Sequence, residues 1–192
     1  GPAAGTSALP FEYTPAGQRA KIATLLGLLR DLAGGESAAA AMNAPYGTSS
    51  WTSSIDLSGR SFEYGGNYAT DSFRDTMQLM VTRGRWFDRT DSGTPGEAVV
   101  INERLARELF GREDPVGRTI TPDPPRIREV PRQPAMRIVG VIRDFRKAGE
   151  FAPADNYAFF RNNLDESYTG MRVPRWLLVR ARHGSGATFE EQ

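Results

Sequence analysis

The chain has 192 residues, 24 basic and 23 acidic side chains, and no cysteine. This length suits one domain, or one domain divided into two lobes. Proteins that bind duplex nucleic acid usually carry a clear basic excess, so a net charge of +1 argues against nucleic acid as a partner. Without cysteine the chain forms no disulfide, thiolate nucleophile or cysteine-bound metal site. No apolar run of about 18 residues predicts a membrane span.

The N-terminal part of the sequence predicts a β-α-β unit. Phe11 and Tyr13 alternate around a glutamate, which predicts a short strand within residues 3–13. A threonine-proline pair then begins a segment with leucines at helical spacing, and a double glycine ends it, so we expect a helix over 15–33. The small side chains of residues 37–42 favour a buried strand packed against that helix, although their composition also permits a helix. Residues 1–2 (Gly-Pro) are typical of the remnant of a cleaved tag, so we interpret the sequence as an excised piece.

The middle of the chain, from residue 46 to 135, predicts a mixture of short strands and helices. Alternation or apolar runs predict strands at 51–57, 79–81, 98–101 and around 120. Capping residues predict two helices, one from Asp71 or Ser72 to Met77 and one over 103–110 that begins at Asn102 and ends at Gly111. Residues 61–66 are expected to form a loop carrying Phe62 and Tyr64, and the proline-rich residues 121–135 an exposed extended loop.

The C-terminal part predicts three more strands, at 136–143, 157–160 and 176–181. Residues 188–191 (TFEE) form a capping box, which begins a helix only one residue before the sequence stops. A helix needs more than one turn to be stable, so we expect the natural chain to continue past Gln192. The order of all these elements is that of an α+β protein.

The sequence contains little that predicts catalysis or metal binding. The single histidine, His183, has no partner for a two-histidine zinc site, and we interpret it as a loop residue, with a general base as the alternative. Asp88, Asp91 and Asp144 offer oxygen ligands for calcium, but their spacing is not that of an EF-hand loop. Phosphate-binding glycine loops and nucleophile elbows are absent from the sequence. We therefore predict no catalytic, cofactor-binding or metal-binding residue.

Four aromatic residues, Tyr46, Trp51, Phe62 and Tyr64, gather in one short region. Aromatic side chains are enriched at protein interfaces, so these four are the candidate partner-contact residues. Local packing beneath a loop is the alternative, and the sequence leaves both open.

Several phrases occur in an order that is characteristic of one family. A helix ends in LAGGESA at residues 32–38, and GRWF follows at 84–87 before an acidic loop that contains Asp91. The remaining phrases are AVVINERLARELF at 98–110, DPVGR at 114–118 and IVGVIRD at 138–144.

In these phrases the chain, over residues 15–183, resembles the periplasmic core domain of MacB-like ABC transporter permeases. It departs from the family pattern at Ala33, Gly35 and Ser72, and its proline-rich insert at 121–135 is long. The resemblance implies a two-lobed α+β fold. A membrane-proximal, porter-like β-α-β lobe would come from residues 3–45 and 136–192, and an inserted mixed lobe from 46–135.

The resemblance also implies a function and a location. Such a domain stands on the periplasmic side of the cytoplasmic membrane, between the first and second transmembrane helices of its permease. It needs no cofactor or catalytic residue, because a separate cytoplasmic domain hydrolyses ATP and the motion is passed outward to a periplasmic adaptor protein or an exported substrate. The parent protein is expected to be dimeric and the isolated domain a monomer. The alternative is a freestanding periplasmic binding module, or a regulator of a cell-wall hydrolase.

Overall fold

The structure is a computed structural model that describes residues 14–31, 35–45, 51–125, 133–144, 154–164 and 173–181. These residues form three α-helices, a short 3-10 helix at Arg89–Asp91, and nine strands. The helices are α1 (Pro15–Asp31), α2 (Phe73–Met77) and α3 (Glu103–Phe110). The strands are β1 (Gly35–Ala41), β2 (Trp51–Leu57), β3 (Arg60–Ala69), β4 (Val81–Gly84), β5 (Glu97–Asn102), β6 (Thr119–Ile120), β7 (Met136–Ile142), β8 (Tyr157–Arg161) and β9 (Trp176–Ala181).

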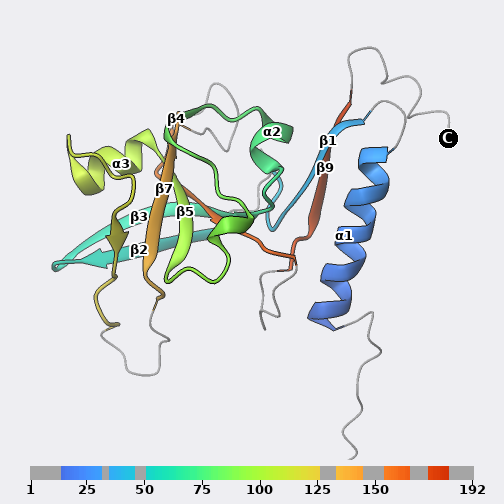
Figure 1. The fold of residues 1–192 in the computed structure, drawn as a ribbon. Coiled ribbons are helices and arrows are strands. Elements are labelled where there is room, and N and C mark those ends of the chain that lie inside the picture. The colour runs from blue at the N-terminus through green and yellow to red at the C-terminus, as the bar shows by residue number, and fades with distance from the viewer. Residues whose placement is uncertain are drawn as a thin grey trace, which may run out of the picture.

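All the strands belong to one mixed sheet, with the order β4-β7-β5-β8-β3-β1-β9 (Figure 1). Strand β2 forms a hairpin with β3, and β6 pairs with β7. The pairs β5–β7 and β3–β8 are parallel, and the others are antiparallel. The predicted α+β class is therefore confirmed.

One end of the sheet, formed by β1 and β9, is covered by a helix on each face. Leu26 of α1 packs on Ala38 and Ala40, whereas Ala39 belongs to the cluster that contains Phe73 of α2. Successive residues of a strand point to opposite faces, so α1 and α2 lie on opposite sides of β1. Alanine side chains let both helices approach the strand closely. We call α1, α2, β1 and β9 the terminal unit, and the rest of the described sheet with α3 the main unit.

The main unit has an apolar cluster on each face of its sheet. Val99 and Ile101 of β5 belong to the cluster that contains Leu105 of α3, whereas Val100 belongs to the cluster of Phe73. This second cluster also contains Ala39 of β1, so it extends into the terminal unit. Strand β8 divides its side chains in the same way, with Phe160 in the first cluster and Phe159 in the second. Both faces are therefore buried, as the continuous apolar runs of β5 and β8 require.

Two glycines allow the chain to cross itself next to β7. Gly84 has φ +65° and lies against the carbonyl oxygen of Val139, and Gly140 lies against the carbonyl oxygen of Arg85. A Cβ atom at either position would overlap that oxygen. The backbone N–H of Arg85 donates to the Val139 carbonyl over 3.0 Å. Gly84 of the GRWF phrase and Gly140 of the IVGV phrase are thus both required by the close approach of the same two backbone segments.

Most of the elements predicted in the described range are confirmed, including the helix at 103–110 with its Asn102 cap and its end at Gly111. Residues 37–42 are strand rather than helix, apart from their last residue. The predicted loop at 61–66 is wrong, because β3 runs through it and pairs with β2 across a turn at Ser58 and Gly59. Gly65 and Gly66 of β3 weaken the strand pattern in the sequence. Glycine is needed at both positions, because the ring of Tyr157 occupies the space beside Gly65 and the ring of Trp51 occupies the space beside Gly66.

Two other expectations need adjustment. The strand expected at 79–81 lies later, at Val81–Gly84. Ser72 is the N-cap residue of α2, but its hydroxyl makes no capping hydrogen bond. The predicted strand within residues 3–13, Tyr46, His183 and the capping box at 188–191 lie outside the described residues, as does part of the loop at 121–135.

The strand pairing bears on the predicted lobes. From residue 136 onward, β7 and β8 pair with β3, β4 and β5, whereas β9 pairs with β1. The lobe boundaries at residues 45 and 136 remain a prediction, and this pairing favours a C-terminal boundary between β8 and β9.

Candidate functional site

The terminal and main units meet where β1 leaves β3. Only one register pair, Ala41 with Ala69, joins these two strands, whereas six pairs join β1 to β9. We call this boundary the seam. The backbone pairing at the seam is narrow, whereas the apolar cluster that contains Ala39, Phe73 and Phe159 continues across it.

Side chains continue the hydrogen bonding of β1 beyond that single pair. The Thr70 hydroxyl accepts from the backbone N–H of Ala40 over 3.0 Å, and the Ser72 hydroxyl donates to the carbonyl of Ala38 over 2.7 Å. The backbone N–H of Thr70 also donates to the Ala40 carbonyl, over 3.0 Å. These bonds satisfy backbone groups of β1 that would otherwise be buried without partners.

On the other side of the Ala41–Ala69 pair, the side-chain amide of Asn67 binds the backbone of Asn43. The Asn67 carboxamide oxygen accepts from the backbone N–H of Asn43, and its nitrogen donates to the Asn43 carbonyl, each over 3.0 Å. Asn67 is buried, so these two bonds satisfy both ends of its amide in a place shielded from water.

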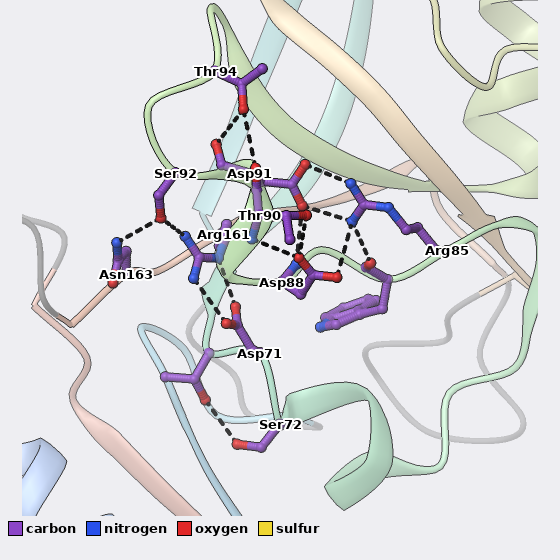
Figure 2. A network of polar contacts seen from close by, with 12 residues as sticks. Asp71, Ser72, Arg85, Asp88, Thr90, Asp91, Ser92, Thr94, Arg161 and Asn163 are labelled. Atoms are coloured by element: carbon purple, nitrogen blue, oxygen red, sulfur yellow. Dashed lines mark hydrogen bonds and ion pairs between the residues drawn. The ribbon is translucent and has the colours of Figure 1, made fainter.

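A charged group bridges the seam between Asp71 and Arg161 (Figure 2). The Nε and Nη2 atoms of Arg161 donate to the two carboxylate oxygens of Asp71 over 2.8 and 2.9 Å. Its Nη1 donates to the Ser92 hydroxyl over 2.6 Å, and the Asn163 amide donates to the same hydroxyl over 3.1 Å. Asp71 lies between the end of β3 and the N-cap of α2, and Arg161 ends β8 opposite Ala69 of β3, so this group lies where the main unit leads into α2.

A second charged group stiffens the loop that supplies Ser92. Asp91 is 2% exposed at its side chain and accepts two 2.8 Å hydrogen bonds from Arg85 and one of 2.8 Å from Arg137. It also accepts from the backbone N–H of Asp88, over 3.0 Å, and so completes a capping box. Burial alone would raise the pKa of the Asp91 carboxyl. The hydrogen bonds from Arg85, Arg137 and Asp88 outweigh this and hold its pKa well below the usual range.

Two cavities flank the charged bridge between α1 and the main unit. The smaller, of about 160 Å³, is lined by Arg19 of α1 and by Asp91 and Glu97 of the main unit, among others. The larger, of about 400 Å³, is lined by Leu26 and Arg30 of α1 and by Arg89, among others. Both cavities include residues 161–163 in their walls. Side chains on the two sides of the seam are therefore separated by open space along part of the boundary.

The structure places three of the four predicted partner-contact residues in or against the core. Phe62 and Tyr64 are buried, and Trp51 packs with its ring centroid 6.0 Å from that of Tyr64 and 5.8 Å from that of Phe160. Burial raises the pKa of the Tyr64 phenol. These positions favour the packing alternative that the sequence left open. Contact with a partner stays a prediction, and Tyr46 lies outside the described residues.

The acidic residues considered for calcium are already committed to other groups. Both carboxylate oxygens of Asp91 bind arginine, and the Asp88 carboxylate accepts from the backbone N–H of Thr90 over 2.7 Å. Asp144 accepts from the backbone N–H of Arg104 over 2.7 Å at the start of α3. In the ranges that the structure describes, no three acidic or histidine side chains are grouped as metal ligands. Likewise, no helix there is long and apolar enough to cross a bilayer.

The sequence alone does not predict that Asp71, Arg161 and Ser92 form a charged group. Asp71 and Arg161 are 90 positions apart, and Ser92 lies in a polar loop without a distinctive motif. A single sequence carries no signal that pairs residues so distant. Only Asp91 has a partial sequence signal, because it falls in the acidic loop after the GRWF phrase.

The fold is similar to that of two solved extracytoplasmic domains of ABC-type transporters. The periplasmic region of MacB from Actinobacillus actinomycetemcomitans matches with a TM-score of 0.57 and 16% identity, over 88% of this chain and 68% of the other. The extracellular domain of the noncanonic ABC-type transporter YknZ from Gram-positive bacteria matches with a TM-score of 0.58 and 16% identity, over 85% and 74%.

The family follows from the sequence match. The family model described as MacB-like periplasmic core domain matches residues 11–191, and the chain belongs to this family. Two curated relatives, both named macrolide export ATP-binding/permease protein MacB, are from Chlorobium luteolum and Chlorobium phaeobacteroides. They are 33% and 32% identical over 76 residues, which is 39% of this chain and 10% of each relative. The matched part is thus a small fraction of those proteins.

Proposed function

We propose that the chain is the extracytoplasmic domain of an ABC transporter permease of the mechanotransmission type. ATP-driven motion in the cytoplasm would pass through the transmembrane helices of the permease to this domain. The domain would then act on a periplasmic adaptor protein or an export substrate. Family membership supports the location of the domain, and the curated relatives support the link to an ATP-binding permease.

The observation that carries the mechanical part is the seam. The two units share one β1–β3 register pair, a few backbone and side-chain hydrogen bonds and two flanking cavities. Beneath this boundary, one apolar cluster continues from Ala39 and Phe73 to Trp86 and Phe159. Domain motions of the shear or hinge type need rigid bodies joined by a boundary that costs little to rearrange. The terminal unit would receive the motion, because it contains α1, the helix that would follow the first transmembrane helix of the permease. The main unit would then pass the motion to the partner.

The proposed domain performs no chemistry of its own. Its buried carboxylate, Asp91, is held ionised by Arg85 and Arg137, which suits a structural anion better than a proton donor or acceptor at neutral pH. ATP hydrolysis would belong to a separate cytoplasmic domain or subunit of a dimeric parent protein.

Cross-linking the seam in the full-length parent tests this function. Arg30 of α1 and Arg89 of the main unit both line the larger cavity, so cysteines at these positions face one space. In a cysteine-free parent, a flexible bifunctional thiol reagent should leave ATP hydrolysis in place and abolish export. The matched control is the Arg30→Cys single variant with the same reagent, which should keep both activities. If the cross-linked protein exports normally, the mechanical function is wrong.

The partner is tested by affinity capture from the cell envelope with the full-length protein. Capture of an adaptor or an exported substrate supports the proposed function. Capture of a cell-wall hydrolase instead would favour the alternative of a hydrolase regulator.

A further inference from the structure

We propose that the open edge of β3 at Ser61 and Glu63 is a binding site for an extended, basic segment of a partner protein. The segment would add to the sheet as a further strand beside β3. The site itself is a property of this chain. That a periplasmic adaptor or an exported protein supplies the segment rests on the proposed function.

Residues 60–64 of β3 have a neighbouring strand on one side only, within the part of the chain that the structure describes. They pair with β2, whereas β8 pairs with β3 from Gly65 onward. Gly65 donates its N–H to the main-chain carbonyl of Asn156, and the Glu63 carbonyl accepts from the Asn156 side-chain amide. Backbone groups of an antiparallel strand alternate between its two sides, so the N–H of Glu63 and both backbone groups of Ser61 also face away from β2.

The opposite edge of the same hairpin is covered by the chain itself. The N–H of Asp123 donates to the Asp56 carbonyl over 2.7 Å, and the Gln133 amide donates to the Ser54 carbonyl over 3.0 Å. An unpaired strand edge is a template for another strand, and proteins usually cover or charge it. Figure 1 shows the hairpin of β2 and β3 projecting away from the terminal unit. Its covered edge is thus closed to a partner, whereas the edge of β3 is available.

There is room beside the open edge for an added strand. A cavity of about 580 Å³ lies there, larger than either cavity next to α1. Its walls include the five consecutive residues 61–65 of β3, and Arg104 and Glu108 of α3. The open space therefore coincides with the backbone groups that lack a strand.

The charge around the edge selects the partner. Glu63, Glu108 and Asp155 line the cavity with one basic residue, Arg104, and all four side chains are exposed. Among the described residues, no group forms a hydrogen bond or ion pair with the Glu63 carboxylate. A second copy of this chain would bring the same negative charge to the edge, so self-pairing is disfavoured. In strand addition the main chain supplies affinity and the side chains supply specificity, so lysine and arginine in the segment are favoured.

Peptide binding to the 192-residue chain tests the site. The probe is an acetylated and amidated peptide of alternating lysine and threonine, and the matching glutamate–threonine peptide is its control. At saturation, the N–H groups of Ser61 and Glu63 should exchange with solvent about tenfold more slowly, because they become hydrogen bonded. Glu63→Gln should weaken binding about threefold at low salt. Glu36→Gln on β1 removes the same charge from a residue outside the cavity and should leave the affinity unchanged.

Ser61→Pro separates strand addition from simple charge attraction. Proline removes the N–H that faces the open edge, is tolerated on edge strands, and leaves every charge in place. This variant should bind the lysine peptide at least about threefold more weakly. If it fails to fold, the exchange measurement on the parent chain decides.

Four results would overturn the proposal: no binding of the lysine peptide, equal affinity for both peptides, binding without slower exchange at Ser61 and Glu63, or slow exchange of these two N–H groups in the free chain. The last result would show that the edge is already covered. None of these measurements needs transport. Failure of the site is therefore distinguishable from failure of the proposed function, which the cross-linked full-length protein tests.

Discussion

Arg85 holds the carboxylate of Asp91 with two hydrogen bonds, each 2.8 Å long, that run from Nη1 and Nη2 to the two carboxylate oxygens. The same arginine presses its backbone carbonyl against Gly140 of β7. One residue of the GRWF phrase thus fixes both the crossing beside β7 and the loop that carries Ser92. The phrase is therefore structural in this chain, and its role is to support the seam from the main unit.

Replacing Asp91 tests this support. Asp91→Asn keeps the shape but turns one hydrogen-bond acceptor into a donor that faces a guanidinium. We expect a loss of about 2–3 kcal/mol in the free energy of unfolding. That is somewhat below the usual cost of breaking a buried ion pair, because Arg85 remains partly in water. Urea denaturation measures it. Asp75→Asn is the control and should stay within about 0.5 kcal/mol of the parent chain.

The same carboxylate predicts an acid-dependent loss of stability. The pKa of the Asp91 carboxyl is lower in the folded chain than in the unfolded chain, where an aspartate has a pKa of about 3.9. The stabilisation is therefore complete above that unfolded value and is lost as the pH falls toward the folded pKa. The difference in melting temperature between the parent chain and Asp91→Asn should be constant from pH 7 to pH 5 and narrow below pH 4. A difference that stays constant down to pH 2 would contradict this.

The contact of α1 with β1 predicts which leucines matter. Leu26 is buried against Ala38 and Ala40, whereas Leu28 is 58% exposed. Leu26→Ala should cost about 2–5 kcal/mol, because it removes core contacts and leaves a cavity. Leu28→Ala should cost less than about 0.5 kcal/mol. Chemical denaturation measures both losses. Equal losses of unfolding free energy at the two positions would show that the Leu26 face of α1 is not the face that packs on β1.

The sequence predicted most elements because local signals decide them. The Asn102 cap and the leucine spacing of α1 are set by neighbours within one helical turn. Strand β3 was missed because its glycines are required by rings of Trp51 and Tyr157, which come from other strands. The ion pair of Asp71 and Arg161 is likewise not predicted by the sequence, since the two residues meet only after β3 and β8 have paired.

Trp51 distinguishes packing from partner contact. Its ring covers Gly66 and contacts the rings of Tyr64, Tyr68 and Phe160. If packing is its main role, Trp51→Ala should lower the free energy of unfolding by about 2–4 kcal/mol, near the range for large aromatic truncations. Calorimetry measures this. An unchanged melting temperature together with weaker binding of a captured partner would restore the contact role.

Two glycines give opposite predictions for the same substitution. A Cβ at Gly140 would overlap the carbonyl of Arg85, whereas a Cβ at Gly27, inside α1, meets no atom within 4 Å. Gly140→Ala must displace the crossing of the chain beside β7, so we expect a loss of several kcal/mol or failure to fold. Gly27→Ala should stabilise the chain by about 0.5–1 kcal/mol, because alanine restricts the unfolded state and favours the helix. Both values come from urea denaturation of the purified variants. If Gly140→Ala unfolds at the same urea concentration as the parent chain, the two backbone segments do not approach as closely as described, and the proposed contact between Arg85 and β7 is wrong.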